Sequence, residues 1–211
     1  PTCQLTNATT TTNYATTASN NTGFNWSLSN AAAGNINATT GVMTWANGFS
    51  GVVNIQVTAN GCNGPSAQVV RTVNITPTVG VPSTPTPSAT TICQGNGNTT
   101  YTTSATNATS YTWSVTGVGN SISGTGTTGT VTWAANFIGS ATISVVANGC
   151  NGPSASAGTT VTVNEIPTLT LSSDPTTTSQ NICIDTGLTN ITYEIGGSAT
   201  SASLTGTLPA G

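Results

Sequence analysis

The sequence almost lacks charge. Its 211 residues include one basic residue, Arg71, no lysine, no histidine and four acids, so that only 2% of the chain is charged. Binding to nucleic acid or to an anionic membrane requires clustered lysine and arginine side chains. Both kinds of partner are therefore excluded. The chain also lacks a long apolar run, so no membrane insertion is expected within this segment.

The same shortage excludes most chemistry. General acid–base catalysis needs histidine, acid or lysine side chains at a pocket, and a cysteine nucleophile needs a base beside it. Calcium needs several carboxylate or carbonyl oxygens, and zinc needs clustered cysteine and histidine. The acids come late in the chain and are interpreted as scattered surface residues. We predict no enzyme, no catalytic residue, no metal site and no cofactor; the acids are Glu165, Asp174, Asp185 and Glu194.

One stretch of the sequence occurs twice. Residues 45–67 return, slightly altered, as residues 133–155, a distance of 88 residues. A period of this length indicates one domain duplicated in tandem, because solenoid units run about 20–50 residues. Within each copy apolar and small polar residues alternate, as at Val53, Ile55 and Val57, which is typical of a strand with one buried face. The Asn-Gly pairs that follow favour a tight turn and a returning strand.

The spacing of such patterns predicts the fold class. Seven or so short strands in fewer than 90 residues, with turn residues between them, are typical of an immunoglobulin-like sandwich, and no stretch has a helical period. We predict an all-β chain of tandem sandwiches, interpreted as a window of a longer array. The predicted parts are a domain at 1–76, a semi-rigid Pro/Thr-rich linker at 77–88, a second domain at 89–166 and a truncated third domain at 167–211.

The five cysteines suggest disulfides. Cys3 and Cys62 occupy the same repeat positions as Cys93 and Cys150. The start of the first strand and the last turn are expected to lie at the same pole of a sandwich, which predicts a bond within each domain, with free buried thiols as the alternative. Cys183 is left over, and its partner is expected beyond Gly211. Disulfides place the chain outside the cytoplasm.

The four tryptophans are candidates for a binding surface. Aromatic side chains stack on sugars in carbohydrate-binding modules, so a platform is one interpretation. Each domain, however, carries an equivalent pair on strands of alternating pattern, where a tryptophan in the core is the ordinary arrangement. We predict that these aromatics belong to the core: Trp26, Trp45, Trp113 and Trp133.

Three motifs carry a resemblance to a known family: Ile-Cys-Gln-Gly at 92–95, Tyr-x-Trp-x-Val at 111–115 and Ala-Asn-Gly-Cys-Asn-Gly at 147–152. They resemble the PKD-like, Ig-like repeats of giant secreted adhesins of gliding bacteria, the SprB-like gliding-motility adhesins exported by type IX secretion. The acidic Asp-x-Gly-Asp pattern of classical PKD domains is missing here, since Ser-Val-Thr follows Trp113. The resemblance implies an extracellular, cell-surface location.

These observations predict a non-enzymatic structural repeat, the stalk of a long adhesin that serves gliding or surface attachment. Its partners would be neighbouring domains of the same long chain. Two alternatives stay open at this point. One is an adhesive module that binds a surface polysaccharide, and the other is a subunit of a self-assembling extracellular filament.

Overall fold

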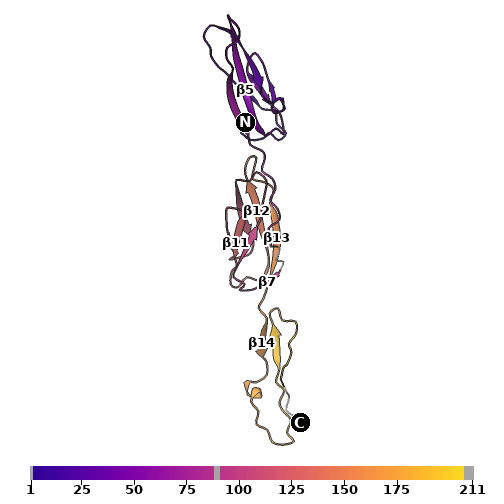
Figure 1. The fold of residues 1–211 in the computed structure, drawn as a ribbon. Helices are drawn as coiled ribbons and strands as arrows, with labels where there is room; N and C mark the ends of the chain where they lie inside the picture. The colour runs from indigo at the N-terminus through magenta and orange to yellow at the C-terminus, as the bar shows by residue number, and fades with distance from the viewer. Residues whose placement is uncertain (1, 88–90, 207–211) are drawn as a thin grey trace.

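The computed structural model describes residues 2–87 and 91–206 and shows three bodies that follow one another end to end (Figure 1). Strands run roughly along the long axis of each body. Three features of the predicted domain limits lie outside the described residues: the first residue, the boundary between residues 88 and 89, and the end of the third domain at 207–211.

The first body is a sandwich of two three-stranded sheets. One sheet has the strand order β1-β4-β3 and the other has the order β2-β5-β6. All pairs in both sheets are antiparallel, and a single 3₁₀ turn precedes β3. The elements are β1 (Thr11–Asn13), β2 (Asn21–Leu28), η1 (Ala31–Ala33), β3 (Gly34–Ile36), β4 (Val42–Trp45), β5 (Gly51–Gly61) and β6 (Val69–Ile75).

The second body repeats this plan with one more strand. Its sheets have the orders β10-β11-β8 and β7-β13-β12-β9, and the short β7 runs parallel to β13. In the described part of the first body, an isolated parallel bridge between Cys3 and Thr76 stands in the place of this pairing. The strands are β7 (Thr91–Cys93), β8 (Asn98–Thr102), β9 (Ser110–Val115), β10 (Ser121–Ser123), β11 (Thr128–Thr132), β12 (Gly139–Asn148) and β13 (Ala157–Asn164).

The third body is much slighter. Its described part holds one antiparallel pair, β14 (Thr168–Leu171) with β15 (Tyr193–Gly196), and a 3₁₀ turn, η2 (Pro175–Thr178). Many of its apolar side chains are exposed, including Ile184 and Leu204. The sequence difference between this segment and the two repeats is thus matched by a difference in structure.

Each sandwich has its own core between its two sheets. Along β12 the side chains of Ala141, Ile143 and Val145 are buried, while their neighbours in the strand are more accessible. This is the two-residue alternation that the sequence shows, and β5 has the same pattern. All four tryptophans are buried, with 3–8% of their surface exposed. The predicted all-β fold of tandem immunoglobulin-like sandwiches is confirmed.

A glycine accompanies one tryptophan in each core. A Cβ added to Gly129 would lie 2.5 Å from Cδ2 of Trp113, and one added to Gly41 would lie 2.8 Å from Cε2 of Trp26. Any larger residue would push the indole out of its place, because cores are packed to crystal-like density. The two glycines are equivalent in the repeat, 88 residues apart.

The segment expected to be a linker, residues 77–88, is structured differently. Val79 is buried in the core of the second domain, and Pro82 and Pro85 are buried as well. Backbone hydrogen bonds join Ser83 to Ser104 and Thr86 to Thr102. Most of the predicted spacer therefore belongs to the second sandwich. Its prolines predict an extended backbone, but the sequence pattern did not show that this backbone is laid along a sheet edge.

The cores generate a first prediction. Replacing Ile143 by alanine should lower the free energy of unfolding of the second domain by about 2–5 kcal/mol, because the change leaves a cavity at a fully buried site. Val118 is 93% exposed in the same domain, and its replacement by alanine should change stability by no more than about 0.5 kcal/mol. Thermal or denaturant unfolding measures both, and equal effects of the two substitutions would contradict this core.

Candidate functional site

The feature that distinguishes this chain lies between its first two domains. Sγ of Cys3, at the start of the first domain, is bonded to Sγ of Cys150, in the turn after β12 of the second domain. The two Cα atoms are 5.4 Å apart, although the residues are separated by 147 positions in the sequence. The disulfide therefore joins the lower pole of one sandwich to the upper pole of the next.

This bond contradicts the pairing predicted from the sequence, which joined Cys3 to Cys62 and Cys93 to Cys150. The reason is strand direction. Cys93 lies opposite Asn164 at the end of β13, whereas Cys150 follows the far end of β12, which is antiparallel to β13. The first-strand cysteine and the turn cysteine of one domain thus lie at opposite poles. Only consecutive domains bring the two kinds of cysteine together.

Polar contacts surround the disulfide. Nδ2 of Asn151 donates to the backbone oxygen of Gln4 at 2.7 Å and to Oγ1 of Thr78 at 2.9 Å. The N–H of Val79 donates to the carbonyl oxygen of Cys150 at 3.0 Å. One residue of the turn thus contacts both the first domain and the connection. In the sequence Asn151 is recognisable only as part of a turn, and nothing in its spacing indicates a contact across domains.

The turn itself is shaped to receive the connection. Asn151 adopts a left-handed conformation, with φ of 58°, which asparagine tolerates better than most residues. A Cβ added to Gly149 would lie 3.0 Å from Cβ of Val79, and one added to Gly152 would lie 3.1 Å from a Val79 methyl. The glycines let the connecting chain approach the turn closely. The Asn-Gly pairs of the repeat therefore serve the junction as well as the hairpin.

Both halves of this junction occur a second time in the chain. Cys62 lies in an equivalent turn at the upper pole of the first domain, where Asn63 again has a positive φ of 73°. Cys93 lies at the lower pole of the second domain, where Gln94 donates its N–H to Asn164 just as Gln4 donates to Thr76. Cys62 and Cys93 are exposed and unbonded, and so is Cys183.

The other predicted site residues are not brought together. The buried tryptophans form no sugar platform, and the indole N–H groups of Trp45 and Trp133 donate to threonine hydroxyls at 2.9 Å. Within residues 2–87 and 91–206, no three potential metal ligands form a group. Asp174 caps η2, and hydrogen bonds from the hydroxyl and the amide of Thr176 lower the pKa of its carboxyl group.

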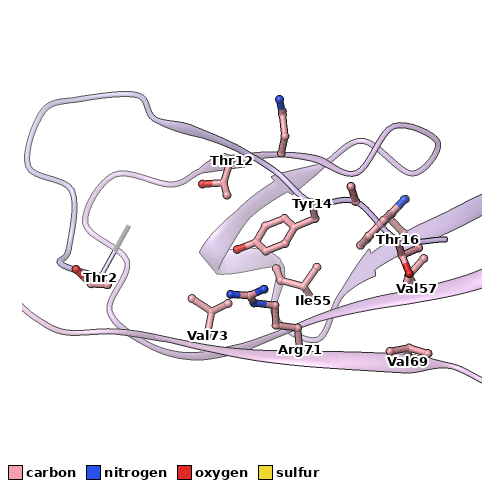
Figure 2. A pocket seen from close by; sticks show the side chains of 12 residues that line it. Thr2, Thr12, Tyr14, Thr16, Ile55, Val57, Val69, Arg71 and Val73 are labelled. Carbon is pink, nitrogen blue, oxygen red and sulfur yellow. The ribbon is translucent and has the colours of Figure 1, made fainter.

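A groove of about 640 Å³ opens on the side of the first domain (Figure 2). Tyr14 lies over it with Arg71 below, and Cζ of Arg71 is 6.0 Å from the centre of the tyrosine ring. Burial raises the pKa of the Tyr14 phenol above its ordinary value, and the positive charge of Arg71 partly offsets this rise. The floor is apolar and includes Ile55, Val57 and Val73. No motif or spacing in the sequence indicates this groove.

The comparisons with known proteins bear on the second domain first. Residues 80–163 match the model of the PKD-like domain. A comparison with curated protein sequences finds no match. In the part of the chain that the structure describes, no helix is long and apolar enough to cross a membrane.

Three solved structures with a similar fold illustrate the likeness. Protocadherin gammaB7 EC3-6 is 16% identical with a TM-score of 0.46, over 81% of this chain and 48% of that one. The D00-D0 domain of intimin is 15% identical with a TM-score of 0.40, over 75% and 94%. The human desmocollin-1 ectodomain is 17% identical with a TM-score of 0.34, over 67% and 30%. The chain thus spans about half of the protocadherin fragment.

Thiol counting tests the junction. The oxidised chain should expose three thiols to a maleimide, at Cys62, Cys93 and Cys183, since only Cys3 and Cys150 are bonded. Replacing Cys3 by serine should raise the count to four, because Cys150 loses its partner. Bonds within each domain would instead give one thiol in the parent and two in the variant. Mass spectrometry of the labelled protein distinguishes these outcomes.

Proposed function

We propose that this segment is a non-enzymatic structural repeat region of an extracellular, adhesion-type protein, a stalk whose domains are fixed end to end. The observation that carries the proposal is the disulfide between Cys3 and Cys150, which joins consecutive domains. Domains linked by a simple peptide connection are expected to move relative to one another. Here a covalent bond and the contacts of Asn151 hold the junction at several points.

The composition supports the same function. Structural disulfides persist in oxidising compartments, so the bond is in keeping with a place outside the cytoplasm. A nearly uncharged surface of hydroxyl and amide groups keeps its contacts at any ionic strength, because there is little charge to screen. The finer assignment, to a gliding-motility adhesin on a bacterial surface, is supported by the sequence motifs and by the match of residues 80–163 to the PKD-like domain.

The position of the disulfide determines how tension passes through the chain. A force applied at the N-terminal end enters at Cys3 and crosses directly to Cys150. The body of the first domain and most of the second then lie inside a closed loop and carry no load. In the chain-entropy model, closing a loop of 147 residues destabilises the state in which both domains are unfolded by about 5 kcal/mol.

We extend the proposal to the unbonded cysteines. Cys62 and Cys93 are the open halves of the same junction, ready for further repeats above and below. With both bonded, tension would run through the 31 residues between them, a path of about 105 Å at 3.3–3.6 Å per residue. The strands β5 and β12, of 11 and 10 residues, indicate that two folded domains already span about 70 Å. Such an array could lengthen by only about half before its covalent network became taut.

Single-molecule pulling on the whole chain tests the load path. Under oxidising conditions we expect no unfolding step from the first domain, and only the residues after Cys150 should extend, by about 200 Å at full stretch. Reductant should release about 500 Å more, since residues 4–149 then join the load path. Cys3→Ser should behave like the reduced chain and Cys62→Ser like the oxidised parent. Whole-domain steps in the oxidised parent would contradict the proposal.

A three-sandwich chain tests the open halves. A second copy of residues 77–164, placed directly after Asn164, adds two cysteines and one junction. If Cys93 bonds to the turn cysteine of the added copy, the thiol count stays at three, and Cys93→Ser raises it to four. A bond confined to the added domain would also give three thiols in the parent, but Cys93→Ser would then lower the count to two. The second result would show that the junction bond is not a general property of these repeats.

A further inference from the structure

The groove in the first domain marks a difference between two otherwise equivalent sandwiches. The strand register aligns the two domains residue by residue. Thr11 pairs with Thr44, and Asn98 pairs with Thr132, so Thr11 and Asn98 are counterparts. Tyr14 and Tyr101 follow these two residues by three positions each and are therefore counterparts as well. Val53 pairs with Val73 as Ala141 pairs with Val161, which makes Val73 the counterpart of Val161. The side of the groove can therefore be compared directly with the same side of the second domain.

On that side the second domain is closed. Tyr101 and Val161 are fully buried, whereas Tyr14 and Val73 are only half-buried. In the floor of the groove the difference is small: Ile55 and Val57 are 2% and 7% exposed, and their counterparts Ile143 and Val145 are fully buried. The apolar floor is thus the same in both domains, and only its cover differs.

The cover in the second domain is the segment 81–87, Val-Pro-Ser-Thr-Pro-Thr-Pro. Thr86 and Thr102 exchange backbone hydrogen bonds, with N–O distances of 2.9 and 2.6 Å. The N–H of Ser83 donates to the carbonyl oxygen of Ser104 at 2.9 Å, and Oγ1 of Thr103 donates to the carbonyl oxygen of Ser83 at 2.6 Å. The segment is therefore an extended strand along this sheet edge, and the residues between its prolines supply the N–H donors that bond to the edge.

The first domain presents the matching edge without a strand on it. Ala15 and Thr17 are the counterparts of Thr102 and Ser104, two residues to which the covering segment is bonded. Within residues 2–87 and 91–206, no backbone hydrogen bond is made by Ala15, Thr16 or Thr17. Unpaired backbone groups beside an apolar floor are the usual setting in which an extended peptide adds to a sheet edge.

We propose that this groove is an acceptor site for an extended, uncharged Pro-x-x-Pro segment of the type found at residues 81–87, supplied by the stretch that precedes the first strand of a repeat. Prolines at the positions of Pro82 and Pro85 would cover the apolar floor. Backbone groups at the positions of Ser83 and Thr86 would pair with Thr17 and Ala15, as they do with Ser104 and Thr102 in the second domain. An extended proline-containing segment loses little conformational entropy on binding, which favours this kind of occupant.

The residues around the groove set the chemistry of the occupant. Among the described residues that line the groove, Arg71 alone is charged, and its counterpart in the second domain is Thr159. Arg71 is paired with the ring of Tyr14, so a basic segment would be repelled there. An uncharged segment of Pro, Ser and Thr meets the floor and the edge without disturbing this pair. This site does not depend on the stalk function, since it rests on the comparison of the two domains.

The test adds the occupant to the chain. The sequence of residues 81–90, placed directly before Pro1, keeps the spacing to the next cysteine that the second domain has. The thermal midpoint of the first domain should rise by about 4 °C or more. The indole N–H signals of Trp26 and Trp45 report on that domain, and those of Trp113 and Trp133 serve as an internal reference. The amides of residues 15–17 should become protected from hydrogen exchange.

Three variants of the extended chain separate pairing from a general effect of the added residues. Ala15→Pro removes the N–H that the strand would use, and this N–H has no partner in the parent structure, so the substitution should abolish the rise. Ala67→Pro, in an exposed loop of the same domain, should leave the rise intact. An extension with aspartate in place of both Pro82 and Pro85 should stabilise little.

Three results would overturn the proposal. The first is an unchanged midpoint together with unchanged exchange at residues 15–17. The second is an equal rise with the Ala15→Pro variant or with the aspartate extension. The third is binding of an oligosaccharide by the unextended chain that perturbs Tyr14 while the extension has no effect, which would assign the groove to a sugar ligand instead.

Discussion

The one-sided burial of two long strands determines most of this structure. β5 and β12 each bury alternate side chains against the opposite sheet. The side chains that share each core follow from which face of these two strands is buried. Because each strand runs from one end of its sandwich to the other, its direction also decides which residues lie at which pole. The turn cysteines come to the upper pole and the first-strand cysteines to the lower pole. A disulfide between domains is the geometric consequence.

The scarcity of charge explains the kind of contacts found at the surface. With one basic residue in the chain, ion pairs cannot hold domains together, and hydroxyl and amide groups do so instead. The junction uses the side chains of Asn151 and Thr78 and the backbone of Gln4 and Val79. Neutral hydrogen bonds are weak singly, about 1 kcal/mol net, so the covalent bond beside them matters more here than in a charged protein.

The two repeats show how similar cores can have different edges. In the second domain a strand that precedes Cys93 covers Tyr101 and Val161 completely, whereas their counterparts Tyr14 and Val73 in the first domain are only half-buried. An apolar floor and an unpaired edge are what a sandwich offers when one of its strands comes from elsewhere. The junction joins two consecutive domains, whereas the covering strand of the second domain comes from the stretch directly before its own first strand.

The sequence alone determined the class of fold, the period of the repeat and the identity of the core. Alternation at Val53, Ile55 and Val57 requires a strand with one buried face, and the pairing of each tryptophan with such a strand places the indoles inside. These are local properties, because side-chain direction in a strand is settled within two residues. The tertiary structure decided the partners of the cysteines, the packing of the segment at 77–88 and the open groove. Each of these depends on which pole or edge a residue reaches after several strands have folded back, and no local pattern in the sequence records that path.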